Sequence, residues 1–358
     1  MLRIEMLPAE HGDCLWIEYG NKNKPYRILI DGGTELTYAS LSDKIRSLDE
    51  NDRKFELLII THIDADHIAG VLKLIESSSL LRITFSDVWF NGYRHLPGTE
   101  LEEFGPVQGE KLSTMLVGKQ LPWNKAFAKK AVTNLMPSVT LPGGMKLTLI
   151  SPAVNELEKL KPVWVKACRE ADIDPTHLKQ ATPIVPPGLE GMGPINVDTL
   201  AATPFISDDS ESNGSSIAIL AEYDGCAALL AGDAHPSGLL KGIESVCNAR
   251  QVSKLKLDAF KLPHHGSKKN NNRELIEKVE CKRYLFSTNG AKHRHPDREA
   301  VARVIKYGGR APELIFNYRT EFNEVWRDAN SMGQYHYIVS YPNFSGSKNS
   351  SGTNIGLS

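Results

Sequence analysis

One short segment constrains the fold of this chain more than any other. Residues 56–61 read ELLIIT, and HIDADH follows directly at residues 62–67. A continuous apolar run of this length is typical of a strand that is buried on both faces. Apolar residues then recur through residues 68–75 at the spacing of a helix with one buried face. The polar segment therefore lies on a loop between a buried strand and a helix, where a rigid scaffold can direct short side chains to one point.

The loop contains four side chains of types that bind metals, namely His62, Asp64, Asp66 and His67. Helix capping could explain Asp66 alone, but it does not explain four such residues within one loop. We therefore predict a metal site here. Further candidates follow other apolar segments: Asp31 in LIDGG, Asp233 in LLAGDA, His264 and His265 in KLPHHGS, and His293 and His295 in NGAKHRHP. Asp31 is interpreted as a turn residue or as a hydrogen-bond acceptor behind a ligand.

Composition places the chain among soluble globular proteins. It has 358 residues, a hydrophobic fraction of 41% and a charged fraction of 24%, enough for one large domain or two ordinary ones. The net charge of −1 gives no support for a globally basic nucleic-acid coat or a polybasic membrane binder. Any attraction for an anionic substrate must therefore be local.

The cysteines and the N-terminus bear on the compartment. The 5 cysteines are scattered and never form a CxxC pair, which argues against a disulfide scaffold or a thiolate zinc site. The start of the chain lacks a signal-peptide stretch, and no apolar run reaches the ~18 residues of a membrane helix. We therefore expect a cytoplasmic protein with no membrane contact.

The pattern along the chain indicates one domain with an insertion. Two strand-rich halves, each followed by helical segments, favour an α/β (α+β) fold with two packed sheets and helices outside. Residues 172–213 are rich in Pro, Gly and acidic residues, which is typical of an irregular insertion or a lid. We predict a single domain over 1–343, an irregular insertion at about 93–212 and a disordered tail at 344–358.

The order of these motifs resembles the metallo-β-lactamase superfamily. HxDxDH is followed by a strand-end GD, then PHHGS, then a late HP. Within the superfamily the chain is most similar to the metallohydrolase domain of competence-type DNA-uptake channel proteins and its free-standing relatives. These carry an HGD-like turn, here at 11–13, an LIDGG-like strand end at 29–33 and an Asn-Ser element at 213–216. The resemblance spans roughly residues 3–306, but most of the segment 93–212 has no counterpart in the related domains.

The resemblance implies a four-layer αββα sandwich with a dinuclear metal site at one edge of the sheets. His62 and Asp64 would bind one metal, Asp66 and His67 the other, Asp233 would bridge them and His265 would complete the site. The catalytic set would be Asp66, His264 and His295, with His264 facing the substrate as general acid or leaving-group stabiliser; sequence alone leaves the order of the His264–His265 pair open. Supporting or substrate contacts would come from Asp31, Asn213, Ser215, Lys268 and His293.

The chain departs from the broader superfamily in two places. Asp64 stands where a second histidine is usual, and the histidine expected before the GD strand is replaced by Asn213, Ser215 or Ser216. Oxygen ligands favour harder ions, so we expect two divalent metals, Zn²⁺ or Mn²⁺, with Mg²⁺ also compatible. Two metals about 4 Å apart would clamp a phosphoryl group and generate a hydroxide for in-line attack. The departures therefore favour phosphate chemistry over β-lactam or thioester hydrolysis.

Seven cations flank the later motifs. They are Lys261, Lys268, Lys269 and Arg273 around HHGS, and Lys292, Arg294 and Arg298 around His295. They are interpreted either as a local field for a polyanion or as a solvated basic face. Trp89, Trp123 and Trp164 are assigned to core packing rather than to base stacking.

The leading hypothesis is a cytoplasmic metal-dependent phosphodiesterase or nuclease that acts on an anionic substrate such as a nucleic acid or a nucleotide. A second hypothesis is that a protein of the same fold hydrolyses a phosphocholine, sulfate or acyl ester instead. A third is a metal-holding interaction module without turnover, in which residues 172–213 bind a protein partner. The sequence gives neither the substrate nor the oligomeric state.

Overall fold

The computed structural model of the chain describes residues 1–98, 108–173, 195–342 and 353–357. A six-stranded sheet has the order β18-β1-β2-β3-β5-β7, and an eight-stranded sheet has the order β17-β16-β15-β13-β11-β10-β9-β8. The first contains β18 (Thr353–Leu357), β1 (Leu2–Met6), β2 (Leu15–Asn21), β3 (Lys24–Ile30), β5 (Leu57–Ile59) and β7 (Val88–Trp89). The second contains β17 (Ile338–Ser340), β16 (Glu313–Phe316), β15 (Arg283–Phe286), β13 (Ala259–Lys261), β11 (Cys226–Leu230), β10 (Ala218–Tyr223), β9 (Lys146–Ser151) and β8 (Val139–Thr140).

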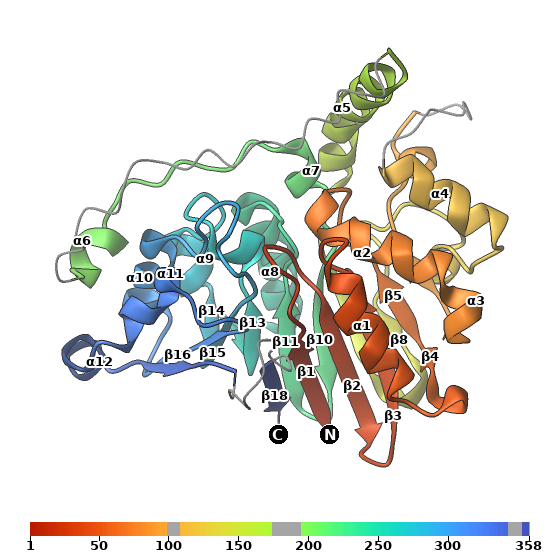
Figure 1. Cartoon of the computed structure of the whole chain (residues 1–358). Helices are drawn as coiled ribbons and strands as arrows, with labels where there is room; N and C mark the ends of the chain where they lie inside the picture. Colours follow the sequence, from red (N-terminus) through yellow and green to blue (C-terminus); the bar gives the residue numbers. More distant parts are fainter. Residues whose placement is uncertain (99–107, 174–194, 343–352, 358) are drawn as a thin grey trace.

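Helices cover the outer faces of the two sheets (Figure 1). On the side of the six-stranded sheet are α1 (Thr37–Arg46), α2 (Ala65–Glu76), α3 (Ser78–Leu81), α4 (Gln108–Gly118) and α5 (Val154–Ile173). On the side of the eight-stranded sheet are α6 (Val197–Ala201), α8 (Pro236–Arg250), α9 (Arg273–Glu277) and α10 (Arg298–Tyr307). The remaining short elements are α7 (Glu211–Gly214), α11 (Glu321–Glu324), α12 (Ala329–Tyr335) and two small sheets, β4 (Lys54–Phe55) with β6 (Thr84–Phe85) and β12 (Leu255–Leu257) with β14 (Val279–Cys281).

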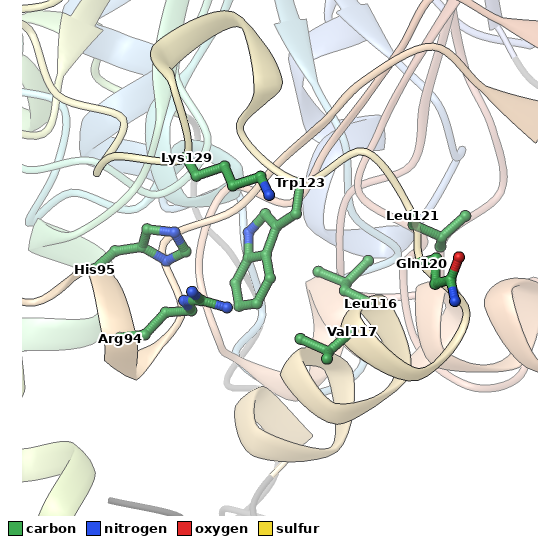
Figure 2. A pocket seen from close by; sticks show the side chains of 8 residues that line it. All are labelled: Arg94, His95, Leu116, Val117, Gln120, Leu121, Trp123 and Lys129. Carbon is green, nitrogen blue, oxygen red and sulfur yellow. The ribbon is translucent and has the colours of Figure 1, made fainter. Parts of the chain in front are cut away.

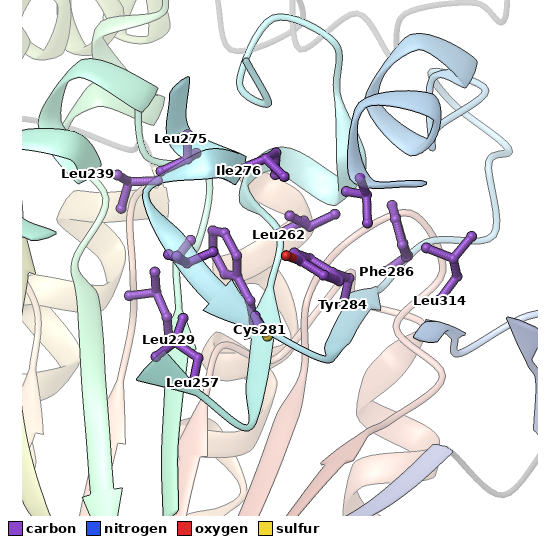
Figure 3. Packing of buried hydrophobic residues seen from close by; sticks show 14 of the residues in the cluster. Leu229, Leu239, Leu257, Leu262, Leu275, Ile276, Cys281, Tyr284, Phe286 and Leu314 are labelled. Atoms are coloured by element: carbon purple, nitrogen blue, oxygen red, sulfur yellow. The ribbon is translucent and has the colours of Figure 1, made fainter. Parts of the chain in front are cut away.

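Three apolar clusters separate four layers. The cluster between the sheets contains Leu57 and Ile59, whereas Leu58 of the same strand packs into the cluster under α1 and α2. Successive residues of a strand face opposite sides, so β5 needs apolar residues on both. The third cluster lies between the eight-stranded sheet and its helices, with Leu229 and Tyr284 packed toward Leu239 and Leu275 (Figure 3). The predicted αββα architecture is therefore confirmed.

The candidate site residues follow parallel strands. β3, β5 and β7 run parallel in one sheet, and β11, β13 and β15 run parallel in the other. The carboxyl ends of parallel strands lie at the same edge, so the loops after them can meet there. Residues 31, 62, 233, 264 and 287 all lie on such loops.

The interpretation of 93–212 as an irregular insertion is wrong for its middle. β9 is an internal strand of the eight-stranded sheet, paired antiparallel with both β8 and β10. Its sequence KLTLIS places Leu147 and Leu149 in the core between the sheets, so β9 is part of the domain. α5 projects from the body beside α7 (Figure 1). Residues 174–194 of the predicted lid lie outside the described residues.

The prediction of a disordered tail over 344–358 is also wrong for its end. Residues 353–357 form β18, which pairs antiparallel with β1 along its whole length. Ile355 and Leu357 alternate with exposed residues and enter the core between the sheets. The polar residues before this segment obscured a short period-two pattern. Among the described residues, no helix is both long enough and apolar enough to cross a membrane.

Candidate metal centre

The N-terminal half of the centre is built on β5 and the start of α2. Asp31, at the end of β3, accepts hydrogen bonds from Thr61 N at 2.8 Å, Thr61 Oγ1 at 2.7 Å and His67 Nδ1 at 2.8 Å. Since the Thr61 hydroxyl donates to Asp31, it accepts from His62 Nδ1 at 3.0 Å. Both imidazoles thus use Nδ1 as the donor and turn Nε2 toward the centre. This is the arrangement by which an acceptor orients a metal-ligating histidine.

The C-terminal half comes from the loops after β11 and β13. Asp233 is buried, and its backbone N–H donates to Ser216 Oγ at 3.2 Å. His264 and His265 lie in the one-turn 3₁₀ helix Pro263–Gly266 with φ values of 49° and 54°, in the left-handed region that non-glycine residues rarely adopt. This tight turn directs His265 inward, where Nδ1 donates to the carbonyl of Ser287 at 2.8 Å.

The two halves converge on the Asp233 carboxylate. Its Oδ2 lies 3.4 Å from His67 Nε2, 3.5 Å from His265 Nε2, 3.8 Å from His264 Nε2 and 3.9 Å from His62 Nε2. Nitrogen and oxygen ligands about 2.1 Å from one tetrahedral metal lie about 3.4 Å apart, so these spacings suit shared coordination.

Several buried atoms at this point have no hydrogen-bond partner among the described residues. They are Nε2 of His62, His67 and His265, and Oδ1 of Asp233. Buried polar atoms are nearly always paired, because an unpaired one costs about 1–3 kcal/mol. A divalent cation would satisfy all four. The residues present therefore fit the metals that this arrangement implies.

The two aspartates of HIDADH behave differently. Asp66 Oδ2 lies 3.6 Å from His265 Nε2, so it connects α2 to the C-terminal half. Asp64 occupies the N-cap position of α2, but its side chain makes no capping hydrogen bond. Instead its Oδ2 lies 3.6 Å from His62 Nε2, and its Oδ1 accepts from Ser212 Oγ at 2.6 Å. Capping therefore does not account for either carboxylate.

Within the described residues, four triads of ligand atoms lie close enough together to hold a metal. They are His62 with His67 and Asp233, Asp66 with His67 and His265, Asp13 with Asp31 and His67, and Asp13 with Asp233 and His265. The structure thus brings together five of the six predicted ligands in these triads, and Asp64 lies at their rim beside His62. The division of these residues between two metals stays a prediction.

Asp13 was missed as a functional residue, although its HGD turn was noted. Its Oδ1 lies 3.4 Å from His265 Nδ1, and its Oδ2 pairs with the buried ammonium of Lys261 at 2.7 Å. Burial would raise the pKa of Asp13, but Lys261 and His265 hold it well below the usual range. No local pattern joins residues 13 and 261, so sequence reasoning had no signal for this pair.

The electrostatics of the metal-free centre are those of a carboxylate–imidazole network. Burial lowers the pKa of His67, but the charges of Asp233 and Asp31 outweigh it and raise that pKa well above its ordinary value. For His265, Asp233 and Asp13 likewise outweigh burial and raise the pKa. The pKa of Asp233 is correspondingly low, because these imidazoles outweigh its burial. Without metal, the cluster therefore holds protons in the place of cations.

His264 has its own set of partners, which sequence reasoning also missed. Its Nδ1 donates to Asn270 Oδ1 at 2.9 Å and lies 3.4 Å from Asp208 Oδ2. Asp208 is held in turn by Asn270 Nδ2 at 2.9 Å and Asn213 Nδ2 at 2.7 Å. Asn213 therefore supports the centre from behind His264. Asp208 lay in the stretch read as irregular, where no periodicity marked it.

The remaining predicted residues fall at different distances from the chemistry. The rings of His264 and His295 have centroids 5.4 Å apart, and that of His293 lies 5.7 Å beyond His295. Burial lowers the pKa of His293 to about 4, with help from Lys292 and His295. Ser215 donates its hydroxyl to the Ser212 carbonyl at 2.6 Å, so it stabilises α7.

The predicted cationic flank is weaker than its residue count suggests. Lys261 is fully buried against Asp13, Lys268 pairs with Glu299 at 2.8 Å, and Arg273 pairs with Glu277 at 2.9 Å. Lys261 is therefore not free to meet a substrate phosphate, and Lys268 and Arg273 would have to leave weak surface ion pairs to do so. Lys292 differs, because its charge lowers the pKa of His11 and His293 beside the centre.

Comparison with known proteins found a family model and several solved structures that are similar to this chain. Residues 8–126 match the family model of the Metallo-beta-lactamase superfamily. A comparison with curated proteins found no match. Among solved structures, the chain is similar to the metallo-beta-lactamase fold protein YhfI from Bacillus subtilis, at 10% identity over 99% of this chain and 100% of that chain, with a TM-score of 0.40.

Two further structures are similar at the same level. A variant of the CmlA beta-hydroxylase is 12% identical over 99% of this chain and 54% of that chain, with a TM-score of 0.43. The metallo-beta-lactamase MIM-1 from Novosphingobium pentaromativorans is 12% identical over 86% of this chain and 89% of that chain, with a TM-score of 0.33. These scores are too low to carry an argument about chemistry.

The match to the family model covers the turn with Asp13, the strand end with Asp31 and the whole HIDADH loop. Members of this superfamily are generally metal-dependent hydrolases. Residues 8–126 are therefore similar to the Metallo-beta-lactamase superfamily, and the αββα layers and the His/Asp clusters agree with that similarity.

Proposed function

We propose that this chain is a metal-dependent hydrolase of phosphodiester bonds. The observation that carries the proposal is the ligand set: carboxylates from Asp66 and Asp233 meet the Nε2 atoms of three histidines in one buried cluster, and the part-exposed Asp64 carboxylate lies at its rim beside His62. Oxygen-rich sites suit Mn²⁺ and Mg²⁺ as well as Zn²⁺, and such ions are suited to phosphate oxygens.

The triads indicate which residues would hold two divalent metals. His62 and His67 with Asp233 form one of these triads and would hold one metal. Asp66 and His265 would hold the other with Asp233, on the distances of 3.6 Å and 3.5 Å from His265 Nε2 to the two carboxylates, which pairs His67 with His62 rather than with Asp66. Metals bound there would supply Lewis-acid stabilisation of the phosphoryl oxygens and activation of water. The chain itself fixes the three imidazoles by hydrogen bonds at Nδ1: His62 to Thr61, His67 to Asp31 and His265 to the Ser287 carbonyl. These bonds set the tautomer and the orientation that leave each Nε2 for a metal.

His264 is suited to protonate the leaving oxygen. Its side chain is 22% exposed, whereas that of His265 is 2% exposed, so only His264 of the pair can reach a substrate. Its Nδ1 is committed to Asn270, which leaves Nε2 to carry the exchangeable proton. Burial lowers the pKa of His264, but Asp233 and Asp208 outweigh it and raise that pKa above its ordinary value, which favours the protonated form that a general acid needs.

The substrate class follows from the charges at the site mouth. Three of the seven predicted cations are paired or buried, and Lys292 is the one whose charge reaches His11 and His293 beside the centre. With Lys269, Arg294 and Arg298 it forms a cationic flank that suits a nucleotide or a nucleic acid. The resemblance to competence-type metallohydrolases supports a nucleotide or nucleic-acid substrate. The buried free cysteines fit the reducing cytoplasm that we propose for this activity.

A substrate panel tests the proposal. Protein treated with EDTA and reloaded with Mn²⁺ or Zn²⁺ is assayed on bis(p-nitrophenyl) phosphate, cyclic nucleotides, single-stranded DNA and RNA, alongside a chromogenic β-lactam, an acyl ester, a sulfate ester and a thioester. We expect metal-restored cleavage of phosphodiesters and loss of it in Asp66→Asn. The control is Asp224→Asn, which changes an exposed turn aspartate. Metal-loaded protein that cleaves another ester and no phosphodiester would refute the proposal.

A further inference from the structure

A cavity unrelated to the metal ligands lies beside Trp123. Its volume is about 310 Å³, and it is lined by residues of the 3₁₀ helix Tyr93–His95, the end of α4 and the loop after α4. The lining residues are Arg94, His95, Leu116, Val117, Gln120, Leu121, Trp123 and Lys129 (Figure 2). This volume is at the small end of ligand pockets, and equals the liquid volume of about ten water molecules.

The two walls of the cavity differ in chemistry. Figure 2 shows Arg94, His95, Trp123 and Lys129 along one wall, and the side chains from α4 and the following residues along the other. The first wall is aromatic and cationic, and the second is mainly aliphatic. The eight lining residues include no carboxylate.

The aromatic wall is held rigidly in place. Trp123 is 7% exposed, its Nε1 donates to the Phe90 carbonyl at 2.8 Å, and its ring stacks on Phe90 at 6.0 Å. The Arg94 guanidinium lies 5.5 Å from the centroid of the Trp123 ring. One face of the indole is thus fixed by Phe90 while the residue lines an open cavity. Such a surface is pre-organised for a flat ligand.

His95 provides an unpaired polar atom at the same wall. It is 8% exposed, its ring meets Trp123 edge-on at 4.6 Å, and its Nδ1 has no hydrogen-bond partner among the described residues. Burial and the Arg94 charge lower the pKa of His95 to about 4, so the imidazole is neutral at pH 7. A buried imidazole nitrogen without a partner is a site where a ligand gains a hydrogen bond.

We propose that this cavity binds a small aromatic anion, a carboxylate or a phosphate ester of a single ring. The ring would lie against Trp123 and the aliphatic side chains of α4, with its edge toward His95, and the anionic group would meet the ammonium of Lys129. Arg94 contributes the contact of its guanidinium with the Trp123 ring and is not assigned to the anionic group. The site is independent of the phosphodiesterase proposal, because none of its lining residues belongs to the metal centre.

Binding is measured by isothermal titration on the full chain stripped of metal with EDTA, so that the metal centre does not contribute. The probes are phenylacetate, phenyl phosphate and the neutral phenylacetamide. We expect millimolar or better binding of at least one anion, as befits a ligand of about ten atoms, and binding of phenylacetamide at least about fivefold weaker. Comparison of the two anions distinguishes a carboxylate from a phosphate site.

Matched variants locate the binding to this cavity. Lys129→Gln removes the cation, and Lys130→Gln changes the neighbouring exposed lysine, which does not line the cavity. Val117→Glu places a like charge on the aliphatic wall at a position that is 58% exposed, and Val117→Leu keeps that wall apolar. We expect Lys129→Gln and Val117→Glu each to weaken anion binding by about fivefold or more, and the two control variants by less than about twofold.

Three results would overturn the proposal. They are no saturable binding of either anion up to about 10 mM, equal affinity for phenylacetamide, and equal loss in Lys129→Gln and Lys130→Gln. Thermal melts of each variant establish that it is folded. Because the metal-free protein is used, failure here leaves the phosphodiesterase proposal intact, and absence of hydrolysis would leave this one intact.

Discussion

The two halves of the metal centre are built in different ways. The N-terminal half takes its ligands His62 and His67 and their support, Thr61 and Asp31, from two adjacent parallel strands and the helix that follows. The C-terminal half takes support for His264, His265 and Asp233 from separate segments, including residues 208, 216, 270 and 287. One half is a compact local unit, and the other depends on several long-range contacts.

This difference has a functional consequence. The local half holds its imidazoles by short hydrogen bonds within the sheet edge, so we expect it to govern metal retention. The C-terminal half includes the more exposed His264 and its carboxylate and amide partners, so we expect it to govern turnover. Asp233 belongs to both, because its Oδ2 faces imidazoles from each half.

Loss of the shared carboxylate should give the largest effect. We expect Asp233→Asn to lower phosphodiester turnover by about a thousandfold or more and to reduce bound metal, because charge stabilisation of several kcal/mol is lost. Elemental analysis after gel filtration and initial rates provide the measurements, with Asp224→Asn as the control. Retained turnover in Asp233→Asn would show that the halves do not meet at this residue.

Metal uptake should depend steeply on pH. Asp233 raises the pKa of His67 in one half and His265 in the other, so the metal-free centre holds protons that the metal must displace. Affinity should therefore rise with pH through the neutral range, by about tenfold per pH unit for each proton released, and fall on acidification. Titrations in buffers of different ionisation enthalpy count the protons released. Release of none would contradict the network.

The support of the local half can be tested at Asp31. The carboxylate accepts on both oxygens, from Thr61 N at Oδ1 and from Thr61 Oγ1 and His67 Nδ1 at Oδ2, whereas an amide has a single acceptor oxygen. We expect Asp31→Asn to weaken metal binding by about 10- to 100-fold, with turnover restored at saturating metal. A competition titration with a metal-binding dye measures the affinity. Loss of turnover that excess metal does not restore would assign Asp31 to catalysis instead.

Support of the C-terminal half should show the opposite pattern. Asp208→Asn should lower kcat by about tenfold while leaving metal affinity within about twofold, because Asp208 orients His264 rather than a buried ligand. Asp209→Asn is the matched control, since its exposed side chain neighbours Asp208 in sequence. Equal losses of metal in Asp208→Asn and Asp31→Asn would remove the distinction between the halves.

Ser212 makes a contact between the halves, and its loss should have the smallest effect. Its hydroxyl donates to Asp64 at 2.6 Å, which joins α7 to the start of α2. We expect Ser212→Ala to weaken metal binding by about three- to fivefold, because a typical hydrogen bond contributes about 1 kcal/mol net and the Asp64 side chain is part-exposed. Ser210→Ala, which removes an N-cap of α7, serves as a control for effects on that helix. Identical affinities in the two variants would show that the contact does not matter to the metal.

The same contrast explains what could be predicted from sequence. Each of the segments ELLIIT, HIDADH and LIDGG is short and continuous in sequence. Periodicity and residue type were therefore enough to indicate a site at strand ends and the metal-binding residue types within it. Asp208, Asn270 and the Asp13–Lys261 pair belong to segments far apart in the chain, and only the closed fold shows that they are neighbours. Lys261 was read as a surface cation because its strand context could not reveal the buried carboxylate facing it.

Two strands beside polar or irregular sequence were placed outside the regular domain for a related reason. β9 is an internal strand and β18 an edge strand, and each is stabilised by pairing with a strand distant in sequence, β10 and β1 respectively. Trp123 was assigned to packing, and it is buried as expected. Trp123 also lines a cavity together with Lys129 and residues of α4. No sequence pattern indicated that these side chains would enclose a cavity.

The most direct test of the central claim is phosphodiester cleavage as a function of added metal. Protein stripped with EDTA is titrated with Mn²⁺ or Zn²⁺, and hydrolysis of bis(p-nitrophenyl) phosphate is followed at each step. The oxygen-rich centre built from His62, Asp66, His67, Asp233 and His265 predicts that cleavage appears with the first bound equivalents, saturates as both positions fill and is absent in Asp66→Asn. Full metal occupancy without phosphodiester cleavage would contradict it.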